Sequence, residues 1–139
     1  MRKFARFSRS LCRAFCAVLL LTALGAQAQW TPLGRNDSFR VYLDPKLIEK
    51  DGDFVRVWQL MDFITAQWAD AQTAVGSIKT LTEYDCSAPR WRTLASQAYS
   101  EQLAEGRMVA SERLPDPQWE GVEAGGTADK VRQIACAKK

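Results

Sequence analysis

Two cysteines carry the clearest chemistry in this chain, because a pair of thiols can be oxidised to a covalent cross-link. Cys86 lies in the segment Glu83-Tyr84-Asp85-Cys86-Ser87, and Cys136 lies close to the last residue. The other two cysteines, Cys12 and Cys16, fall in a segment that we expect to be removed. In an oxidising compartment we therefore expect a disulfide between Cys86 and Cys136, and closing a loop of about 50 residues would stabilise the fold by about 4 kcal/mol. Two free buried thiols are the alternative, whereas the Cys-x-x-Cys spacing of a redox catalyst is absent.

Acidic residues offer two weaker candidates for chemistry. Asp51 and Asp53 flank Gly52 and could contact calcium, but a tight hairpin turn needs the same residues, and the further ligands of an EF-hand loop are missing. Glu83 and Asp85 share one face of an expected strand and could form a catalytic carboxylate pair, which a solvated strand face explains more simply. We expect structural roles for both pairs.

The chain contains no histidine, which removes the commonest general base and a common ligand of zinc, copper and haem iron. It also lacks the Gly-x-Ser-x-Gly motif, a phosphate-binding glycine loop and a dinucleotide fingerprint. Enzymes that use paired carboxylates or a Ser–Lys pair remain the alternative. We expect a non-enzymatic protein with no metal and no cofactor.

Aromatic and basic residues offer candidates for binding a protein partner. The chain has five tryptophans, which are numerous for its size, and core packing should account for most of them. Trp68 is the best candidate for an exposed anchor, because it falls in an expected loop at 67–76. Arg90, Trp91 and Arg92 could contribute to the same patch, or the two arginines could simply form the solvated face of a strand.

The first 28 residues have the pattern of a secretory signal peptide, because a basic segment precedes an apolar run at 14–25 and the small-x-small sequence Ala26-Gln27-Ala28. The run is shorter than the roughly 18 residues of an ordinary membrane span, and an uncleaved anchor is the alternative. Residues 29–139 would then form one domain. Of the 19 basic residues five lie in the leader, so 14 face 16 acidic residues in the domain, a net charge of −2. This balance argues against a nucleic-acid role.

The domain is predicted to be α+β and mainly β, with an antiparallel sheet of about six strands and a short C-terminal helix tied on by the disulfide. Apolar, β-branched and aromatic residues between turn formers mark the strands. The expected strands are 30–34, 39–43, 54–63, 77–86, 91–99 and 108–114. The strand at 54–63 is apolar on both faces, which is typical of a central strand. One helix leaves part of such a sheet uncovered, so we expect self-association as a homodimer.

The connections between these elements are predicted from their turn residues. Asp44-Pro45 should bend the end of the second strand, Asp51-Gly52 should form a hairpin turn, and residues 67–76 should form a mobile loop. Residues 100–107 are a connection with one helical turn. Thr127 is a good N-cap for the helix.

An ordered set of short motifs runs along the whole domain. The motifs are Trp30-Thr31-Pro32-Leu33-Gly34, Tyr42-Leu43-Asp44, Val57-Trp58-Gln59-Leu60-Met61-Asp62-Phe63, Ser77-Ile78-Lys79, Glu83-Tyr84-Asp85-Cys86, Tyr99-Ser100 with Gly106, Trp119 and Cys136. With this set the chain resembles the surface-adhesin protein E family of small exported bacterial domains. The most specific element is the Tyr-Asp-Cys triplet combined with a cysteine in the terminal helix.

The resemblance implies an antiparallel sheet with a C-terminal helix, a Cys86–Cys136 disulfide and a Gram-negative envelope location. The family is named after a surface protein that binds host matrix components. Lipid-anchored adhesins would carry a cysteine at the mature N-terminus, whereas this chain has Gln29, which favours a soluble periplasmic or secreted protein. The expected function is a binding module for an envelope or host-matrix protein. The alternative is a small-ligand carrier or histidine-free enzyme, which would need a concave pocket.

Overall fold

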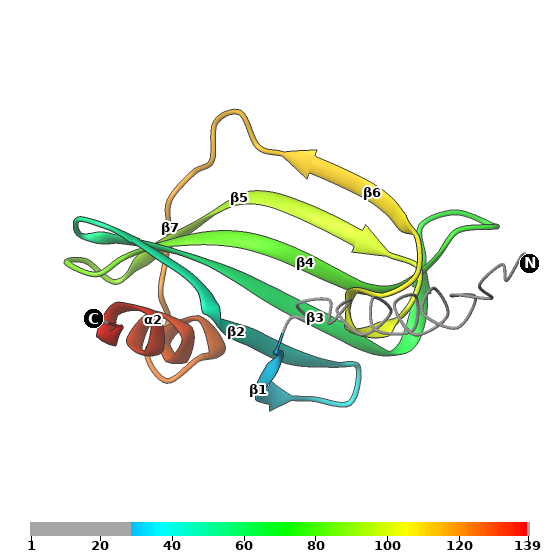
Figure 1. Cartoon of the computed structure of the whole chain (residues 1–139), viewed down its shortest axis with the longest axis horizontal. Helices are drawn as coiled ribbons and strands as arrows, with labels where there is room; N and C mark the ends of the chain where they lie inside the picture. Colours follow the sequence, from blue (N-terminus) through cyan, green and yellow to red (C-terminus); the bar gives the residue numbers. More distant parts are fainter. Residues whose placement is uncertain (1–28, 139) are drawn as a thin grey trace, which may run out of the picture.

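The structure is a computed structural model that describes residues 29–138, and the expected signal peptide at 1–28 lies outside the described residues. Its main feature is one antiparallel sheet in which strand order follows chain order (Figure 1). The strands are β1 (Thr31–Arg35), β2 (Phe39–Asp51), β3 (Phe54–Trp68), β4 (Ala74–Asp85), β5 (Arg90–Tyr99) and β6 (Met108–Arg113). A two-residue strand, β7 (Glu120–Gly121), pairs with the start of β5. The chain ends with the helix α2 (Thr127–Ala137), and the mainly β fold class is confirmed.

Strand β2 is longer than predicted, because it does not end at Asp44-Pro45. The register with β3 shifts between Leu43 and Ile48, and this irregularity accommodates the proline, which has no N–H to donate. The Asp44 carboxylate accepts a hydrogen bond from the Lys46 N–H at 2.9 Å and so holds the irregular segment. Pairing with β3 then resumes and continues to the turn at Gly52, where the predicted hairpin is confirmed and φ is +59°.

The predicted loop at 67–76 is wrong at both ends, because Gln67 pairs with Val75 and Trp68 pairs with Ala74. Only the short segment 69–73 turns the chain. The Asp70 carboxylate accepts the N–H groups of Gln72 and Thr73, each at 2.8 Å, which closes this turn tightly. The small residues of this segment gave no alternating pattern, so the strand ends were missed.

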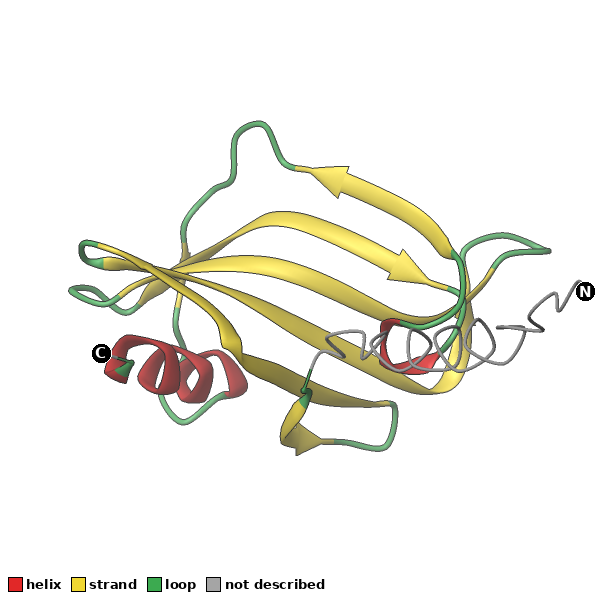
Figure 2. Ribbon diagram, in the orientation of Figure 1, coloured by secondary structure: helices red, strands yellow, loops and turns green. Residues whose placement is uncertain are grey.

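Helix α2 covers one face of the sheet near one end, as Figure 2 shows. Its Val131 and Ala135 are fully buried against the sheet residues Val55, Val57 and Tyr84. The predicted disulfide is confirmed: Cys86, directly after β4, is bonded to Cys136 of α2, and their Cα atoms are 5.7 Å apart. Arg132 reinforces this junction, because its guanidinium donates to the carbonyl oxygens of Asp85 and Cys86 at 2.8 and 3.0 Å.

The N-cap of α2 is Gly126, so the prediction of Thr127 was wrong by one residue. Gly125 before it has φ of +78°, a conformation that glycine adopts without steric cost. The Asp129 carboxylate accepts the Gly125 N–H at 3.0 Å and thereby links the first turn of the helix to the loop that precedes it. Neither helix in the described part of the chain has the length and apolar character needed to cross a bilayer.

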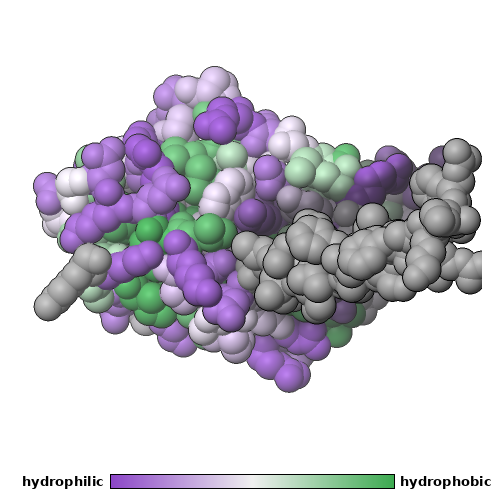
Figure 3. All heavy atoms as spheres, in the orientation of Figure 1, coloured by the Kyte–Doolittle hydropathy of each residue, from purple (hydrophilic) through white to green (hydrophobic). Residues whose placement is uncertain are grey.

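The two faces of β3 are covered by different elements at different ends. Because the pairing with β4 is uninterrupted from Phe54 to Asp62, Val55 and Val57 point to one face, whereas Leu60 and Asp62 point to the other. Helix α2 covers the first pair, and the 3-10 turn η1 (Gln102–Ala104) lies close to the second. In Figure 1 α2 lies beside one end of the sheet, and η1 and the β3–β4 turn lie toward the other. Figure 3 shows that hydrophilic residues surround smaller apolar areas on this side of the molecule.

Candidate functional site

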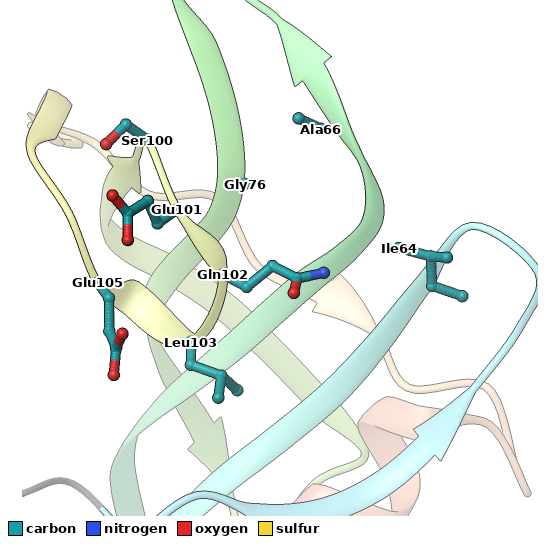
Figure 4. A pocket seen from close by; sticks show the side chains of 8 residues that line it. All are labelled: Ile64, Ala66, Gly76, Ser100, Glu101, Gln102, Leu103 and Glu105. Atoms are coloured by element: carbon teal, nitrogen blue, oxygen red, sulfur yellow. The ribbon is translucent and has the colours of Figure 1, made fainter.

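A pocket of about 570 Å³ lies where β3 turns into β4, between these strands and η1 (Figure 4). We call it the hairpin-end pocket. It is lined by Ile64, Ala66, Gly76, Ser100, Glu101, Gln102, Leu103 and Glu105. The sheet supplies one wall, and the predicted connection at 100–107 supplies the other.

Two buried polar residues of the sheet hold η1 in place. The Asp62 carboxylate accepts the Leu103 N–H at 2.7 Å. The Ser77 hydroxyl donates to the Glu101 carbonyl oxygen at 2.7 Å and accepts the Ala104 N–H at 3.0 Å. Both residues are almost fully shielded from solvent, so these bonds form in a low-dielectric environment, where they are strengthened and where an unpaired group would be costly.

These bonds fix an unusual backbone conformation. Leu103 and Ala104 have φ values of 57° and 61°, in the left-handed region that non-glycine residues rarely adopt. Such a conformation costs roughly 1–2 kcal/mol per residue. The acceptors on Asp62 and Ser77 offset this cost, and they keep the wall of the pocket in one shape.

Gly76 lets η1 lie directly against β4. A Cβ atom at this position would lie 2.4 Å from the carbonyl carbon of Glu101 and 2.7 Å from its oxygen. Only a residue without a side chain allows this close approach of two backbone segments. The pocket therefore depends on glycine at position 76.

The hairpin-end pocket combines apolar and acidic groups. Ile64 and Leu103 are both among the exposed large apolar residues. Figure 4 shows Glu101 and Glu105 on one side of the turn, and the Gln102 side chain extends toward β3, where it donates to the Phe63 carbonyl oxygen at 2.7 Å. Within residues 29–138 no group of three acidic, cysteine or histidine side chains could hold a metal ion. The arrangement suits a ligand with an apolar part and a cationic or hydrogen-bond-donating part.

Trp68 does not line this pocket, but it lies two residues after the lining residue Ala66 and is 67 % exposed. It pairs with Ala74, which is two residues before the lining residue Gly76 in β4, so Trp68 and Gly76 lie on the same side of the hairpin. Trp68 lies in strand β3, whereas the sequence predicted a loop at this position. We refer to Trp68 and the hairpin-end pocket together as the hairpin-end site.

The candidates Arg90 and Arg92 lie at the opposite end of β4 from Trp68, because Arg90 pairs with Asp85 whereas Trp68 pairs with Ala74. The Arg90 guanidinium lies 4.6 Å from the Trp119 ring centre, and that of Arg92 lies 4.4 Å from it. The four candidate residues therefore do not form one patch.

Trp91 is separated from its two neighbours because alternate residues of a strand point to opposite faces. It is half-buried and packs against the core beneath α2, beside Tyr84, with which it pairs across the strands. The arginines face the other side of the sheet. Trp91 and the arginine pair thus belong to different surfaces.

Glu83 and Asp85 are buried, so the expectation of a solvated strand face was wrong. Glu83 accepts hydrogen bonds from Arg56 at 2.9 Å and from Arg92 at 2.7 Å. Asp85 accepts the Ser87 hydroxyl at 2.6 Å and the Arg90 guanidinium at 2.9 Å. These bonds, that of Ser87 first and that of Arg90 next, lower the Asp85 pKa from 3.8 to about 2. Both carboxylates are satisfied within the protein, which indicates a structural role.

No sequence motif marks the hairpin-end pocket, because its walls come from segments that are far apart in the chain. Asp62 and Leu103 are 41 residues apart, and Ser77 and Ala104 are 27 apart. The local signals are Gly76 and Gly106, and both fall in segments that the sequence predicts as connections.

A family model described as surface-adhesin protein E matches residues 30–137. Among solved structures, crystal form II of Haemophilus influenzae protein E superposes with a TM-score of 0.60 and is 14 % identical, covering 76 % of this chain and 92 % of that one. Protein E from non-typeable Haemophilus influenzae gives a TM-score of 0.63 at 16 % identity, covering 84 % of this chain and 79 % of that one. At these identities the likeness to the solved structures establishes the fold. No curated protein sequence matches the chain.

Proposed function

Because this chain belongs to the surface-adhesin protein E family, we propose that it is an exported, non-enzymatic domain that binds a protein partner through the hairpin-end site. The observation that carries this proposal is the exposure of Trp68 on the same hairpin end as a pocket that Glu101 and Glu105 line. Exposed tryptophans that become buried when a partner binds are frequent energetic anchors of protein interfaces. The described residues offer no comparably exposed large apolar side chain.

The chemistry of the site favours a particular kind of partner. Ile64, Leu103 and Trp68 would contact an apolar or aromatic residue, and Glu101 and Glu105 would attract lysine or arginine beside it. We therefore propose a partner segment that combines apolar and basic residues. An envelope protein and a host-matrix protein are both compatible with this chemistry.

The test compares the oxidised, exported protein with its Trp68→Ala variant in binding to purified matrix proteins and to proteins of the cell envelope. We expect Trp68→Ala to weaken the partner's affinity about tenfold to a hundredfold without lowering thermal stability, because the side chain is mostly exposed. Ile134→Ala is the matched control, since it removes an exposed apolar side chain from α2. Equal binding by wild type and Trp68→Ala would reject the hairpin-end site.

The charge of the site supplies a second readout. Replacing Glu101 and Glu105 by glutamine should slow association with the partner and reduce its dependence on salt, because long-range attraction acts mainly on the association rate. An unchanged association rate at low salt would argue against a basic partner segment.

Arg90 and Arg92 form a second proposed contact region. Both keep part of their surface exposed, at 46 % and 30 % of the side chain, although each is held by a buried carboxylate. Arginine to lysine changes are the appropriate variants, because alanine would leave Asp85 or Glu83 without a counter-charge.

We further propose that residues 1–28 are a signal peptide, that residues 29–139 are the mature domain, and that the domain acts in the periplasm or at the surface of a Gram-negative cell. The family supports export and a surface role. We also propose a homodimer formed through the sheet face opposite α2. Trp58 and Leu81 pair on that face, and neither is fully buried.

A further inference from the structure

A second pocket, of about 350 Å³, opens on the face of the sheet that carries α2, beside the first turn of that helix. Val41, Met61 and Trp91 supply apolar surface, and Gln59, Thr82 and Tyr84 supply polar groups. We propose that this pocket binds a small neutral molecule with an apolar body and one hydrogen-bond acceptor, such as an aromatic ketone, ester or amide. We call it the α2 pocket.

The hydrogen-bond donors of the α2 pocket are the first argument. Tyr84 and Gln59 are linked by one hydrogen bond of 3.0 Å. In this bond the Gln59 amide donates to the Tyr84 hydroxyl oxygen. A phenol carries one donor and a primary amide carries two, so the Tyr84 hydroxyl hydrogen and the second amide hydrogen of Gln59 have no acceptor among the described residues. The Tyr84 side chain is almost completely buried, and a buried donor favours a ligand that supplies an acceptor.

The absence of charge among the lining residues is the second argument. The described residues around the α2 pocket include threonine hydroxyls, an amide and a phenol, but no lysine, arginine, aspartate or glutamate. Burial raises the pKa of Tyr84, so the phenol remains a neutral donor at every physiological pH. A charged ligand would lose its hydration here without gaining a counter-charge, whereas a neutral acceptor would not.

Size and shape are the third argument. Small-molecule sites are concave, mostly apolar and usually at least about 300 Å³, with few polar groups that fix the orientation of the ligand. The α2 pocket has this composition. It also lies apart from the hairpin-end pocket, since the two share no lining residue. The proposed ligand therefore would not compete directly with a partner bound at Trp68.

The test titrates the oxidised, exported protein with acetophenone and with ethylbenzene, which has a similar shape but no acceptor, and follows backbone amide signals by NMR. We expect saturable shifts at Thr80, Thr82 and Thr93, and an affinity for acetophenone about threefold to tenfold higher than for ethylbenzene. No saturable shift with acetophenone, or equal affinity for the two compounds, would overturn the proposal.

Variants assign the donor. Tyr84→Phe should reduce the affinity for acetophenone about threefold to tenfold and leave that for ethylbenzene unchanged. Gln59→Leu serves the same purpose if Tyr84→Phe lowers stability. Met108→Ala, which changes an exposed residue of β6 outside both pockets, is the control that should change neither affinity. If Tyr84→Phe and Gln59→Leu each lowered the affinities for acetophenone and ethylbenzene by the same factor, the site would not be specific for a hydrogen-bond acceptor. Tighter binding of benzoate than of acetophenone would reject the neutral class of ligand.

Discussion

Three of the four buried carboxylates among the described residues, those of Asp62, Glu83 and Asp85, organise the polar interior of this domain. Each accepts hydrogen bonds from elements that lie far away in sequence or on the next strand. Asp62 fixes η1, Glu83 joins β3 to β5, and Asp85 fixes the turn between β4 and β5. Individual side chains thus determine where the loops lie on the sheet. Because each of these carboxylates has hydrogen-bond partners within the protein, its burial has a structural explanation and does not require a catalytic role.

Asp85 gives a pH-dependent prediction. Its pKa is about 2 in the folded protein and 3.8 as its ordinary value, so the unfolded state takes up its proton first as the pH falls. The stabilisation by the Asp85 carboxylate is therefore present above about pH 4 and is lost as the pH falls toward 2. Asp85→Asn should lower the free energy of unfolding at pH 7 and flatten its decrease between pH 4 and 2.

Urea unfolding of wild type and Asp85→Asn at several pH values measures this difference. Asp37→Asn is the control, because Asp37 lies exposed in the turn between β1 and β2. Parallel curves for wild type and Asp85→Asn below pH 4 would show that the carboxylate is not the titrating group.

At the scale of elements, the order of strands and the terminal helix were predictable, because each main strand has its own alternating or β-branched pattern. The extent of β2 and β3 was not. Pro45 ends a regular strand in most contexts, but here a local register shift absorbs it. Residues 67–68 and 74–76 flank a segment of small and polar residues and show no alternating pattern, so their strand conformation follows from cross-strand pairing instead of local propensity.

The candidate site was predictable only in part. Trp68 stood out as a large apolar residue among small polar ones, whereas the wall formed by η1 depends on contacts with Asp62 and Ser77 across many residues. Two consecutive left-handed residues, Leu103 and Ala104, have no sequence signature, because neither is glycine or asparagine.

Gly76 gives a prediction about the contact between β4 and η1. In Gly76→Ala the new Cβ would collide with the backbone of Glu101, so η1 must move away from the strand. We expect a loss of about 1–3 kcal/mol in the free energy of unfolding and faster hydrogen exchange at the Leu103 and Ala104 amides.

Gly34→Ala is the matched control for this change, because no atom lies within 4 Å of the Cβ position at Gly34. Hydrogen exchange measured by NMR separates a local opening of η1 from general destabilisation. If the Leu103 and Ala104 amides exchanged at the wild-type rate in Gly76→Ala, η1 would not depend on the close backbone approach.

At the scale of the whole molecule, the sheet is covered unevenly. Helix α2 lies over one face near one end, and η1 and the Trp119 segment cover parts of the other, where Trp119 stacks on Phe54 with ring centres 5.7 Å apart. Between them Trp58 stays half-buried, with the Lys79 ammonium 4.4 Å from its ring centre. This uneven cover is the physical basis of the proposed homodimer.

We expect analytical ultracentrifugation of the oxidised protein to show a concentration-dependent dimer in the micromolar range. Leu81→Glu should shift the equilibrium to monomer, because a charge would be buried against the second copy. Leu47→Glu, which changes an exposed residue of β2, should leave the equilibrium unchanged. Sedimentation as a monomer only, at all concentrations tested, would contradict the homodimer.

The Cys86–Cys136 bond also determines how the domain would respond to a tensile load. It closes a covalent loop across 50 residues of sequence that contains β5, β6, β7 and α2. A force applied between Gln29 and Lys138 would pass through the sulfur atoms and could pull out only β1 to β4. With roughly 3.5 Å of extended chain per residue, the bond withholds about 170 Å of extension. Under reducing conditions the same force would draw out all of residues 29–138, so the oxidised domain would lengthen much less than the reduced one.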